Sequence, residues 1–439
     1  MNRRDFVKHG AVTGVGVATF GLPRVGQRRD RVDTVNVAVM GVNSRGLALA
    51  ESFAGDGGAE VVAVCDVDVR AMEACITSVA ERQARAPRAV GDFRRTLDDP
   101  DVDALVIASP DHWHMPAALL ALKAGKHVYL EKPCSHNPRE GELIVEAQAK
   151  YGGLVQMGNQ QRSAPESIEV ISEIHAGLIG RAYFARAWYA NTRGSIGRGR
   201  ETAVPEWLDY ELWQGPAPRT PYRDNVVHYN WHWFWRWGTG EICNNGTHEI
   251  DVARWALGVD LPLRVTSTGG RYHFRDDGWK DMPDTQLATF EFEDGKMLTW
   301  QGKSCNGRMV EGRGRGVAVH GEKGTVVIDR AGYVVYDEDN RQRLVSIQTG
   351  SESTLDTRGG GNLTDLHIEN FLASVRGEST PTAPVDEGAT SQLLCHLGNI
   401  AWRKSRDLKV DPTSGQVVGD EDAMGLWGRE YEPGWEPRV

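Results

Sequence analysis

The sequence predicts an α/β fold in two parts, a doubly wound parallel sheet followed by an α+β domain with a large, open-faced mixed or antiparallel sheet. The first part is predicted from residues 35–157, where short apolar runs alternate with Ala/Leu-rich helical segments. The second is predicted from residues 263–329, where strand-like runs follow one another at short spacing. The expected boundaries are 1–33 for a signal and linker, 34–157 and 158–410 for the two domains, and 411–439 for a loosely structured tail.

Length, charge and cysteine content exclude several classes of protein. With 439 residues the chain is long enough for two domains with separate cores. Its formal net charge of −10, with acidic and basic residues interspersed, argues against a nucleic-acid-binding surface. The six cysteines show neither the paired spacing of zinc sites nor the density of a disulfide framework. We therefore predict no bound metal and no nucleic-acid partner.

The first 22 residues have the pattern of an export signal. Arg3 and Arg4 precede an aromatic residue, a lysine and the uncharged run 10–22, which resembles a twin-arginine signal. The run is too short to span a bilayer as a helix, and a frayed basic tail is the alternative interpretation. The signal predicts a periplasmic or otherwise extracytoplasmic location, with the twin-arginine translocase as a partner during export. Cleavage of the signal stays open.

A glycine-containing turn between a predicted strand and a predicted helix is a candidate phosphate site. The apolar run 35–40 leads into Gly41, Asn43, Arg45 and Gly46, and a helical segment follows. The first glycine permits a tight turn, and the helix amino terminus offers unpaired N–H groups and a partial positive charge. Asn43 stands where the Rossmann fingerprint has its middle glycine, so an ordinary turn is the alternative, although Asn tolerates the left-handed backbone.

Asp66 is the candidate for recognising the ribose of a dinucleotide. It ends the predicted strand 60–65 and lies 66 − 41 = 25 residues after Gly41, close to the spacing expected of a ribose-binding carboxylate. Such a carboxylate accepts hydrogen bonds from ribose hydroxyls and repels a 2′-phosphate, so NAD is favoured over NADP. Arg70 is near enough in sequence to weaken that preference. A loop-capping role for Asp66 is the alternative.

Residues 103–133 form a further βαβ unit, around which the Rossmann domain is organised. The carboxyl ends of parallel strands are where an open α/β sheet binds its ligand. The residues at or just beyond the strand ends of this unit are Ser109, Pro110, Asp111, Glu131 and Lys132. A later predicted strand, 154–157, leads to Asn159, whose amide suits the nicotinamide or its ribose. We expect all of these side chains at the cofactor edge.

Several motifs together resemble the glucose–fructose oxidoreductase family, also called Gfo/Idh/MocA. The motifs are the turn from Gly41 to Gly46, Asp66, Ser109-Pro110-Asp111-His112-Trp113-His114, Glu131-Lys132-Pro133 and Gly246-Thr247-His248-Glu249-Ile250-Asp251. The resemblance covers nearly the whole chain after the signal. It implies an NAD(P)-dependent oxidoreductase of sugars or polyols, and it adds His114 to the expected cofactor-binding residues.

The resemblance also implies that Lys132 and His248 are the catalytic residues. Alcohol oxidation needs a group that removes the hydroxyl proton while the cofactor takes the hydride. A desolvated lysine can exchange that proton, and a neutral histidine in the first turn of a helix can bind the same hydroxyl. A solvated lysine and a helix-cap histidine are the alternatives. Asp251 shares nearly the same helical face as His248 and is expected to contact it or the substrate, with a structural role as the alternative.

Asn244 departs from the family pattern, in which many dehydrogenases carry an aspartate four residues before the histidine. An amide can hold a hydroxyl group but cannot carry a proton away. The proton relay then depends on Lys132 and His248 alone, or the reaction is not a simple alcohol oxidation. We assign Asn244 to the substrate-binding residues.

An aromatic stretch in the second domain predicts a wall that faces a carbohydrate. Residues 229–237 contain Trp231 and several further aromatic rings, and such rings stack on the apolar faces of sugars. For any single ring, a place in the core or in a subunit interface is the alternative. The open-faced sheet invites packing of two copies, which is the habit of the family, so we expect a homo-oligomer.

Two functions of different classes follow from these predictions. The leading one is an oxidoreductase that transfers a hydride between a nicotinamide cofactor and a hydroxyl of a sugar, polyol or glycoside. The alternative is an exported glycosidase that keeps NAD tightly bound and uses it in a cycle of oxidation, elimination and reduction, which needs no external cofactor supply. The intact Glu131-Lys132-Pro133 motif favours the first, because known glycosidases of this type tend to lose the lysine. A sugar-sensing relative with a vestigial nucleotide pocket is a third reading.

Overall fold

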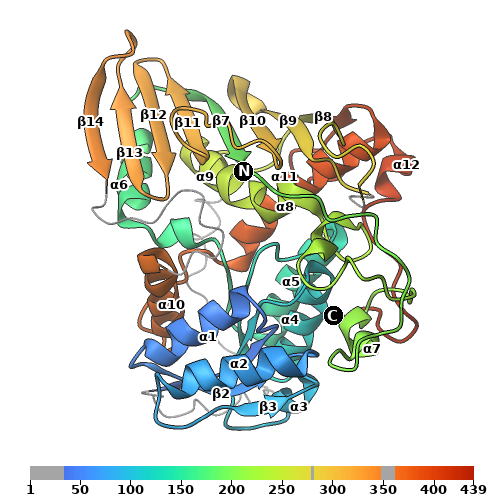
Figure 1. The fold of residues 1–439 in the computed structure, drawn as a ribbon. Coiled ribbons are helices and arrows are strands. Elements are labelled where there is room, and N and C mark those ends of the chain that lie inside the picture. Colours follow the sequence, from blue (N-terminus) through green and yellow to red (C-terminus); the bar gives the residue numbers. More distant parts are fainter. Residues whose placement is uncertain (1–33, 278–280, 348–360) are drawn as a thin grey trace, which may run out of the picture. The chain divides into compact units, whose positions relative to one another are not determined.

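The computed structural model describes residues 34–277, 281–347 and 361–439 (Figure 1). The predicted export signal and linker, residues 1–33, lie outside these ranges. The described residues form a six-stranded sheet and a nine-stranded sheet, as the predicted fold class requires. Within these ranges no helix is both long and apolar enough to cross a membrane.

The six-stranded sheet is parallel and has the Rossmann topology. Its strands are β1 (Val35–Met40), β2 (Ala59–Cys65), β3 (Arg88–Val90), β4 (Ala104–Ile107), β5 (His127–Leu130) and β6 (Val155–Met157). The helices of this domain are α1 (Arg45–Gly55), α2 (Val69–Ala80), α3 (Arg94–Leu97), α4 (Asp111–Lys123) and α5 (Pro138–Tyr151). The strand order is β3-β2-β1-β4-β5-β6, so the direction of winding reverses between β1 and β4. Open α/β sheets bind their ligands at this switch point.

The nine-stranded sheet is mixed, with order β14-β13-β12-β11-β7-β10-β9-β8-β15. Only β7 and β10 pair in parallel among the described strands of this sheet. The strands are β7 (Ala182–Ala190), β8 (Arg264–Gly270), β9 (Thr285–Phe292), β10 (Lys296–Lys303), β11 (Arg315–Gly321), β12 (Gly324–Asp329), β13 (Gly332–Tyr336), β14 (Gln342–Ile347) and β15 (Leu408–Lys409). The remaining helices are α6 (Pro165–His175), α7 (Tyr210–Gln214), α8 (Gly240–Asn244), α9 (Gly246–Leu257), α10 (Gly361–Val375), α11 (Val385–Lys404) and α12 (Glu421–Met424).

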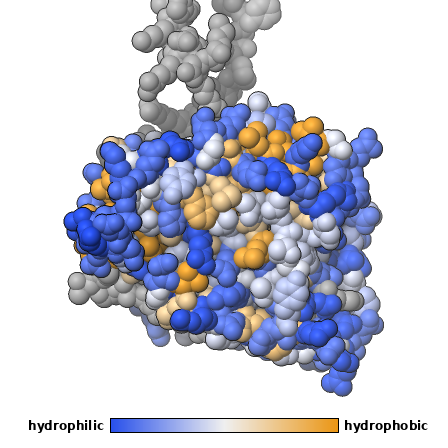
Figure 2. Space-filling view, turned by 90° about the horizontal axis from the view of Figure 1, so that it is seen from above, coloured by the Kyte–Doolittle hydropathy of each residue, from blue (hydrophilic) through white to orange (hydrophobic). Residues whose placement is uncertain are grey.

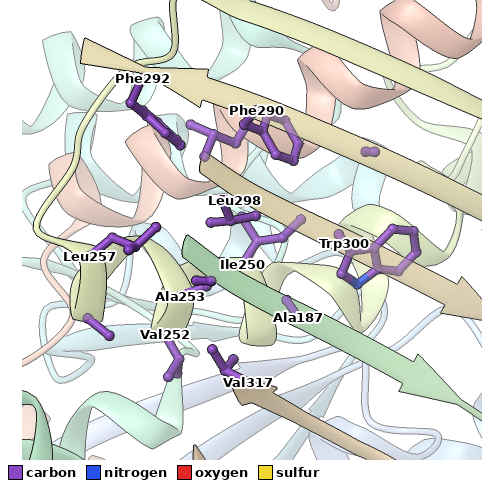
Figure 3. Close-up of a cluster of buried hydrophobic side chains, with 14 of the residues drawn as sticks. Ala187, Ile250, Val252, Ala253, Leu257, Phe290, Phe292, Leu298, Trp300 and Val317 are labelled. Carbon is purple, nitrogen blue, oxygen red and sulfur yellow. The ribbon is translucent and has the colours of Figure 1, made fainter. Parts of the chain in front are cut away.

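Helix α9 is fixed on the large sheet by apolar packing (Figure 3). The packed side chains include Ile250, Ala253 and Leu257 from the helix and Phe290, Leu298 and Trp300 from the strands. Burying a large side chain of this kind contributes about 1.5–3 kcal/mol. At Gly246 a Cβ atom would come within 2.8 Å of the Trp300 ring, so glycine lets the helix begin close to the sheet. This packing fixes the first turn of α9, which carries His248.

The opposite face of the large sheet points away from α9. Along β9 and β10 the buried Phe290 and Leu298 alternate with outward-facing side chains, among them Leu287 and Met297, which are 49% and 37% exposed. Figure 2, which shows the protein from above the view of Figure 1, has small apolar patches within a largely polar surface.

The last part of the chain packs on the Rossmann domain. Helix α10 adds Ile368, Phe371 and Leu372 to the apolar core around β1 and α1. The expectation of a loosely structured tail after residue 411 was wrong, because this segment contains α12 and continues along α4 and α5. Isolated contacts hold it there, and such contacts leave no periodic pattern in the sequence.

Side chains of Arg429, Tyr431 and Trp435 are among those of the tail that make these contacts. The Arg429 Nε donates to Glu140 Oε1 at 2.8 Å, and the Tyr431 hydroxyl donates to the same oxygen at 2.7 Å. The rings of Trp435 and Trp113 meet edge to face with centroids 5.1 Å apart. The tail therefore covers the amino-terminal ends of both helices.

Candidate active site

A cavity of about 910 Å³ opens at the carboxyl ends of the parallel strands and is lined by both domains. The predicted site residues that line it are Gly41, Asn43, Arg45, Asp66, Ser109, Pro110, Asp111, His114, Glu131, Lys132, Trp231, Asn244 and His248. The fold thus brings together side chains that are separated by more than two hundred positions. Gly46, Asn159 and Asp251 do not line the cavity.

The turn after β1 has the geometry of a phosphate site. Gly41 has φ = +83°, and a Cβ atom there would lie 2.6 Å from the Ser109 backbone nitrogen. Gly46 has a different role from the one expected, because its Cβ would lie 2.0 Å from the Gly41 carbonyl oxygen and it therefore permits close packing of helix and turn. The Ser109 Oγ is buried and has no hydrogen-bond partner within the described chain. These features fit the pyrophosphate and ribose of a dinucleotide.

Asp66 lines the cavity directly after β2, at the place where we predicted a ribose-binding carboxylate. The Val42 backbone N–H donates to its Oδ2 at 2.6 Å and the Asp68 N–H to its Oδ1 at 3.0 Å, and burial raises its pKa. Arg70, which follows in the sequence, is held by other groups. Its guanidinium is bound to Asp68 at 2.8 Å and stacks on Trp207 at 3.5 Å, so it is already engaged.

Residues of the second domain cover the adenosine half of the cavity. The His228 Nε2 lies 2.9 Å from Asp68 Oδ2, and Leu208 forms a backbone bridge with Asp68. Leu212 and Trp213, from α7, also line the cavity. We did not predict this cover from the sequence, and the 160-residue separation of His228 and Asp68 leaves no local signal for it.

Glu131 lines the cavity after β5 and is held by two neighbouring side chains. The Arg45 Nε donates to its Oε1 at 2.8 Å, and the Gln160 Nε2 donates to the same oxygen at 3.0 Å. Burial alone would raise the pKa of Glu131, but the charges of Arg45 and Lys132 lower it overall. Glu131 is therefore a fixed carboxylate beside Lys132.

Lys132 reaches across the cavity to Asn244. Its Nζ donates to Asn244 Oδ1 at 2.6 Å. Burial lowers the pKa of Lys132, against the opposing influence of Glu131, Asp111 and Glu241. Because the direct partner is a neutral amide, this hydrogen bond adds no charge that would hold the proton on the lysine.

Glu241 orients Asn244, a role that we did not predict. The Asn244 Nδ2 donates to Glu241 Oε1 at 3.2 Å, so the amide oxygen faces Lys132. Glu241 is itself held by Arg193 Nε at 2.7 Å and by Asn245 Nδ2 at 2.6 Å. Burial opposes its charge, but Arg193 and these hydrogen bonds lower its pKa overall. The spacing of Glu241 and Asn244 along a short helix was the available signal.

His248 lies in the first turn of α9 and faces the same space. Burial, followed by the charges of Arg330, Arg315 and Lys132, lowers its pKa well below the usual value. The imidazole is therefore neutral near pH 7 and has both a donor and an acceptor nitrogen.

Two predicted substrate or cofactor contacts are absent from the described cavity wall. Asp251 forms a bidentate ion pair with Arg162, at 2.8 and 2.9 Å, and accepts a hydrogen bond from Ser391 at 2.6 Å. Asp251 therefore does not line the cavity. We expected it beside His248 because helical spacing alone does not show which side of α9 faces the cavity. The amide of Asn159 is buried, and neither of its polar atoms has a hydrogen-bond partner among the described residues.

Two other predicted residues, His114 and Trp231, line the cavity and also contact protein groups. The ring nitrogens of His114 lie 2.6 Å from the Pro133 carbonyl oxygen and 2.7 Å from the Ser109 carbonyl oxygen, so the ring connects two strand ends. Trp231 stacks on His232 with ring centroids 3.6 Å apart. Its indole can still form part of a wall against a sugar ring.

The turn at Gly41, the carboxylate of Asp66 and the polar side chains of Lys132 and His248 at one cavity define a dinucleotide-binding site of the Rossmann type. Two family models match the chain: "Oxidoreductase family, NAD-binding Rossmann fold" over residues 35–159 and "Oxidoreductase family, C-terminal alpha/beta domain" over residues 216–410. Together they cover well over half of the sequence. The chain therefore belongs to the Gfo/Idh/MocA oxidoreductase family.

Individual relatives include enzymes of two kinds. The chain is 28% identical over 267 residues to inositol 2-dehydrogenase 2 of Saccharopolyspora erythraea, which covers 60% of this chain and 65% of that one. It is 29% identical over 209 residues to a glycosyl hydrolase family 109 protein of the same organism, which covers 43% and 45%. The match spans less than two thirds of either relative.

Solved structures share the fold. Levoglucosan dehydrogenase in complex with NADH and levoglucosan superposes with a TM-score of 0.65 at 17% identity, over 86% of this chain and 99% of that one. At this level of identity the likeness shows the fold alone.

Proposed function

We propose that this protein transfers a hydride between NAD and a hydroxyl-bearing carbon of a sugar, a polyol or a glycoside. The observation that carries the proposal is the group of Lys132, Asn244 and His248 at the cofactor edge, where the lysine is half-buried and contacts the amide at 2.6 Å. The carbohydrate class is supported by the names of the relatives, an inositol dehydrogenase and a levoglucosan dehydrogenase.

In this proposal Lys132 exchanges the hydroxyl proton of the substrate. The lowered pKa of the lysine makes its neutral form accessible, and the neutral amine accepts the proton. Such acid–base assistance is typically worth about 10²- to 10⁴-fold in rate. Bound NAD supplies the hydride acceptor. Asn244 and Glu241 keep the amine directed into the cavity.

His248 holds the same hydroxyl from the other side. A neutral imidazole donates one hydrogen bond and accepts another, so it can position the hydroxyl and share its proton. Its neutrality follows from burial and from the surrounding cations. The aromatic residue Trp231 supplies an apolar surface for the ring of the substrate.

A second candidate is a glycosidase that uses bound NAD in a cycle of oxidation, elimination and reduction. The similarity to glycosyl hydrolase family 109 proteins supports it. So does the cover over the adenosine half, since the contact between His228 and Asp68 would slow the exchange of cofactor. The presence of Lys132 at the reacting end favours the dehydrogenase.

Measuring bound cofactor and turnover together tests the proposal. The purified protein is denatured to quantify released NAD, and the native protein is then incubated with sugars, polyols and aryl glycosides. Net formation of reduced nicotinamide with a free sugar or polyol is the expected result. Release of the aglycone without net reduction would instead establish the glycosidase.

Location and assembly belong to the same proposal. The twin-arginine pattern at Arg3 and Arg4 supports export by the twin-arginine translocase to an extracytoplasmic space. The outward face of the large sheet, with Leu287 and Met297 exposed, supports a homo-oligomer. Fractionation of cells and the molar mass in solution test these two statements.

A further inference from the structure

Arg330 is a positive charge in the cavity that the proposed chemistry does not use. It lies in the turn between β12 and β13, and its side chain lines the cavity together with His248 and Arg315. Of the charges that lower the pKa of His248, that of Arg330 has the largest effect. Arg330 therefore lies in the part of the cavity that contains His248 and Lys132, which we call the reacting end.

The other cations of this cavity are engaged by protein groups. Arg45 is paired with Glu131 at 2.8 Å, Arg193 with Glu241 at 2.7 Å and Arg315 with Glu249 at 2.6 Å, and Lys132 donates to Asn244. Asp329, next in sequence to Arg330, is paired with Arg313 at 2.7 Å. Within the described chain the guanidinium of Arg330 has no hydrogen bond or ion pair.

An unpaired cation in such a place is costly to the folded state. Burial and the neighbouring charge of Arg315 lower the pKa of Arg330 to about 9, which still leaves the guanidinium charged near neutral pH. Arg330 is half-buried. A charge that is partly withdrawn from water and has no partner destabilises a protein, so such groups are typical of sites that bind a ligand of opposite charge.

The anionic partner of Arg330 is either the pyrophosphate of NAD or a group on the substrate. The position of Arg330 distinguishes the two. The pyrophosphate of NAD fits the turn at Gly41 and the amino terminus of α1, in the first domain. Arg330 comes from the second domain and lies beside His248, where the proposed function places the substrate. An anionic group on the substrate is therefore the better match.

We propose that Arg330 binds a carboxylate or phosphate group of the substrate. This inference rests on the proposed function and narrows it to acidic carbohydrates: sugar acids, sugar phosphates or glycosides of them. A guanidinium recognises either group through two parallel N–H···O hydrogen bonds, and such charged hydrogen bonds are strong.

The test measures binding, so its result does not depend on turnover. Cofactor-loaded protein is titrated with glucose, glucuronate and glucose 6-phosphate, and Kd and Tm are measured for the wild type, Arg330→Met, Arg330→Lys and the control Arg341→Met. Arg341 is 68% exposed in the turn before β14 and lies outside the cavity. We expect one of the two acids to bind the wild type and the control more tightly than glucose does.

For Arg330→Met we expect about a tenfold to hundredfold weaker Kd for that acid, with an unliganded Tm equal to or above that of the wild type. Arg330→Lys should recover part of the affinity. The proposal is overturned if no acid binds the wild type more tightly than glucose, or if Arg330→Met binds the acids unchanged. It is also overturned if Arg330→Met loses NAD instead, because the residue would then serve the pyrophosphate.

Discussion

The cofactor half and the substrate half of the cavity are built in different ways. In the cofactor half the decisive features are backbone geometry and short spacing along the chain, as at Gly41 and Asp66. In the substrate half they are long side chains from distant segments, such as Lys132, Asn244 and Arg193, each held by a partner. The cofactor half thus recognises NAD, which stays the same, with a rigid turn. In the substrate half, substitution of single side chains can change which substrate binds.

Replacement of Lys132 should have the largest effect, and it should change catalysis without changing cofactor binding. Lys132→Ala is expected to lower kcat by about 10²- to 10⁴-fold, because the amine that accepts the hydroxyl proton is lost. The amount of NAD that copurifies should not change, because the turn at Gly41 is intact. Lys150→Ala, an exposed lysine on α5, is the control. A kcat close to that of the wild type would remove Lys132 from the mechanism.

A change in the turn should have the converse effect. Gly41→Val places a side chain at φ = +83° with its Cβ 2.6 Å from the Ser109 nitrogen, and strain of this kind costs about 1–3 kcal/mol. We expect about a tenfold or greater loss of NAD affinity and a lower Tm. Gly55→Ala is the matched control, since a Cβ there meets no atom within 4 Å. Isothermal titration with NAD is the measurement, and equal affinity in both variants would contradict the assignment.

The amide at position 244 should set the pH dependence of the substrate half. Asn244→Asp places a carboxylate beside Lys132, and an opposite charge favours the protonated lysine and raises its pKa. Because the neutral amine is the active base, the acidic limb of the kcat/KM profile should move to higher pH by about one unit. Asn306→Asp, an exposed residue near β10, is the control for the added charge. An unmoved limb would mean that another group titrates.

The cover over the adenosine half should have the smallest effect. His228→Ala removes one hydrogen bond to Asp68, which is worth about 1 kcal/mol. We expect NAD to dissociate up to about tenfold faster, with kcat at saturating NAD unchanged. His175→Ala, an exposed histidine on α6, is the control, and stopped-flow displacement of NAD is the measurement. Dissociation at the rate of the wild type would show that the cover does not retain the cofactor.

The difference between the two halves also explains what could be predicted from the sequence. Strand ends, the turn at Gly41 and the carboxylate at Asp66 follow from local patterns, so the Rossmann sheet and most of its contacts with the cavity were predicted. The side chains that hold Asn244 in place were not predicted, because Glu241 and Arg193 come together only in the tertiary fold. Asp251 was misplaced for the same reason: its ion pair with Arg162 joins distant segments. Strands β3, β13, β14 and β15 were also missed.

The packing of the tail sets an order of events during synthesis. Glu140 and Trp113 belong to the first domain, yet their partners Arg429, Tyr431 and Trp435 leave the ribosome about three hundred residues later. Helix α10, which completes the core around β1, is also made late. The nucleotide-binding domain therefore cannot reach its final packing while the chain is still growing.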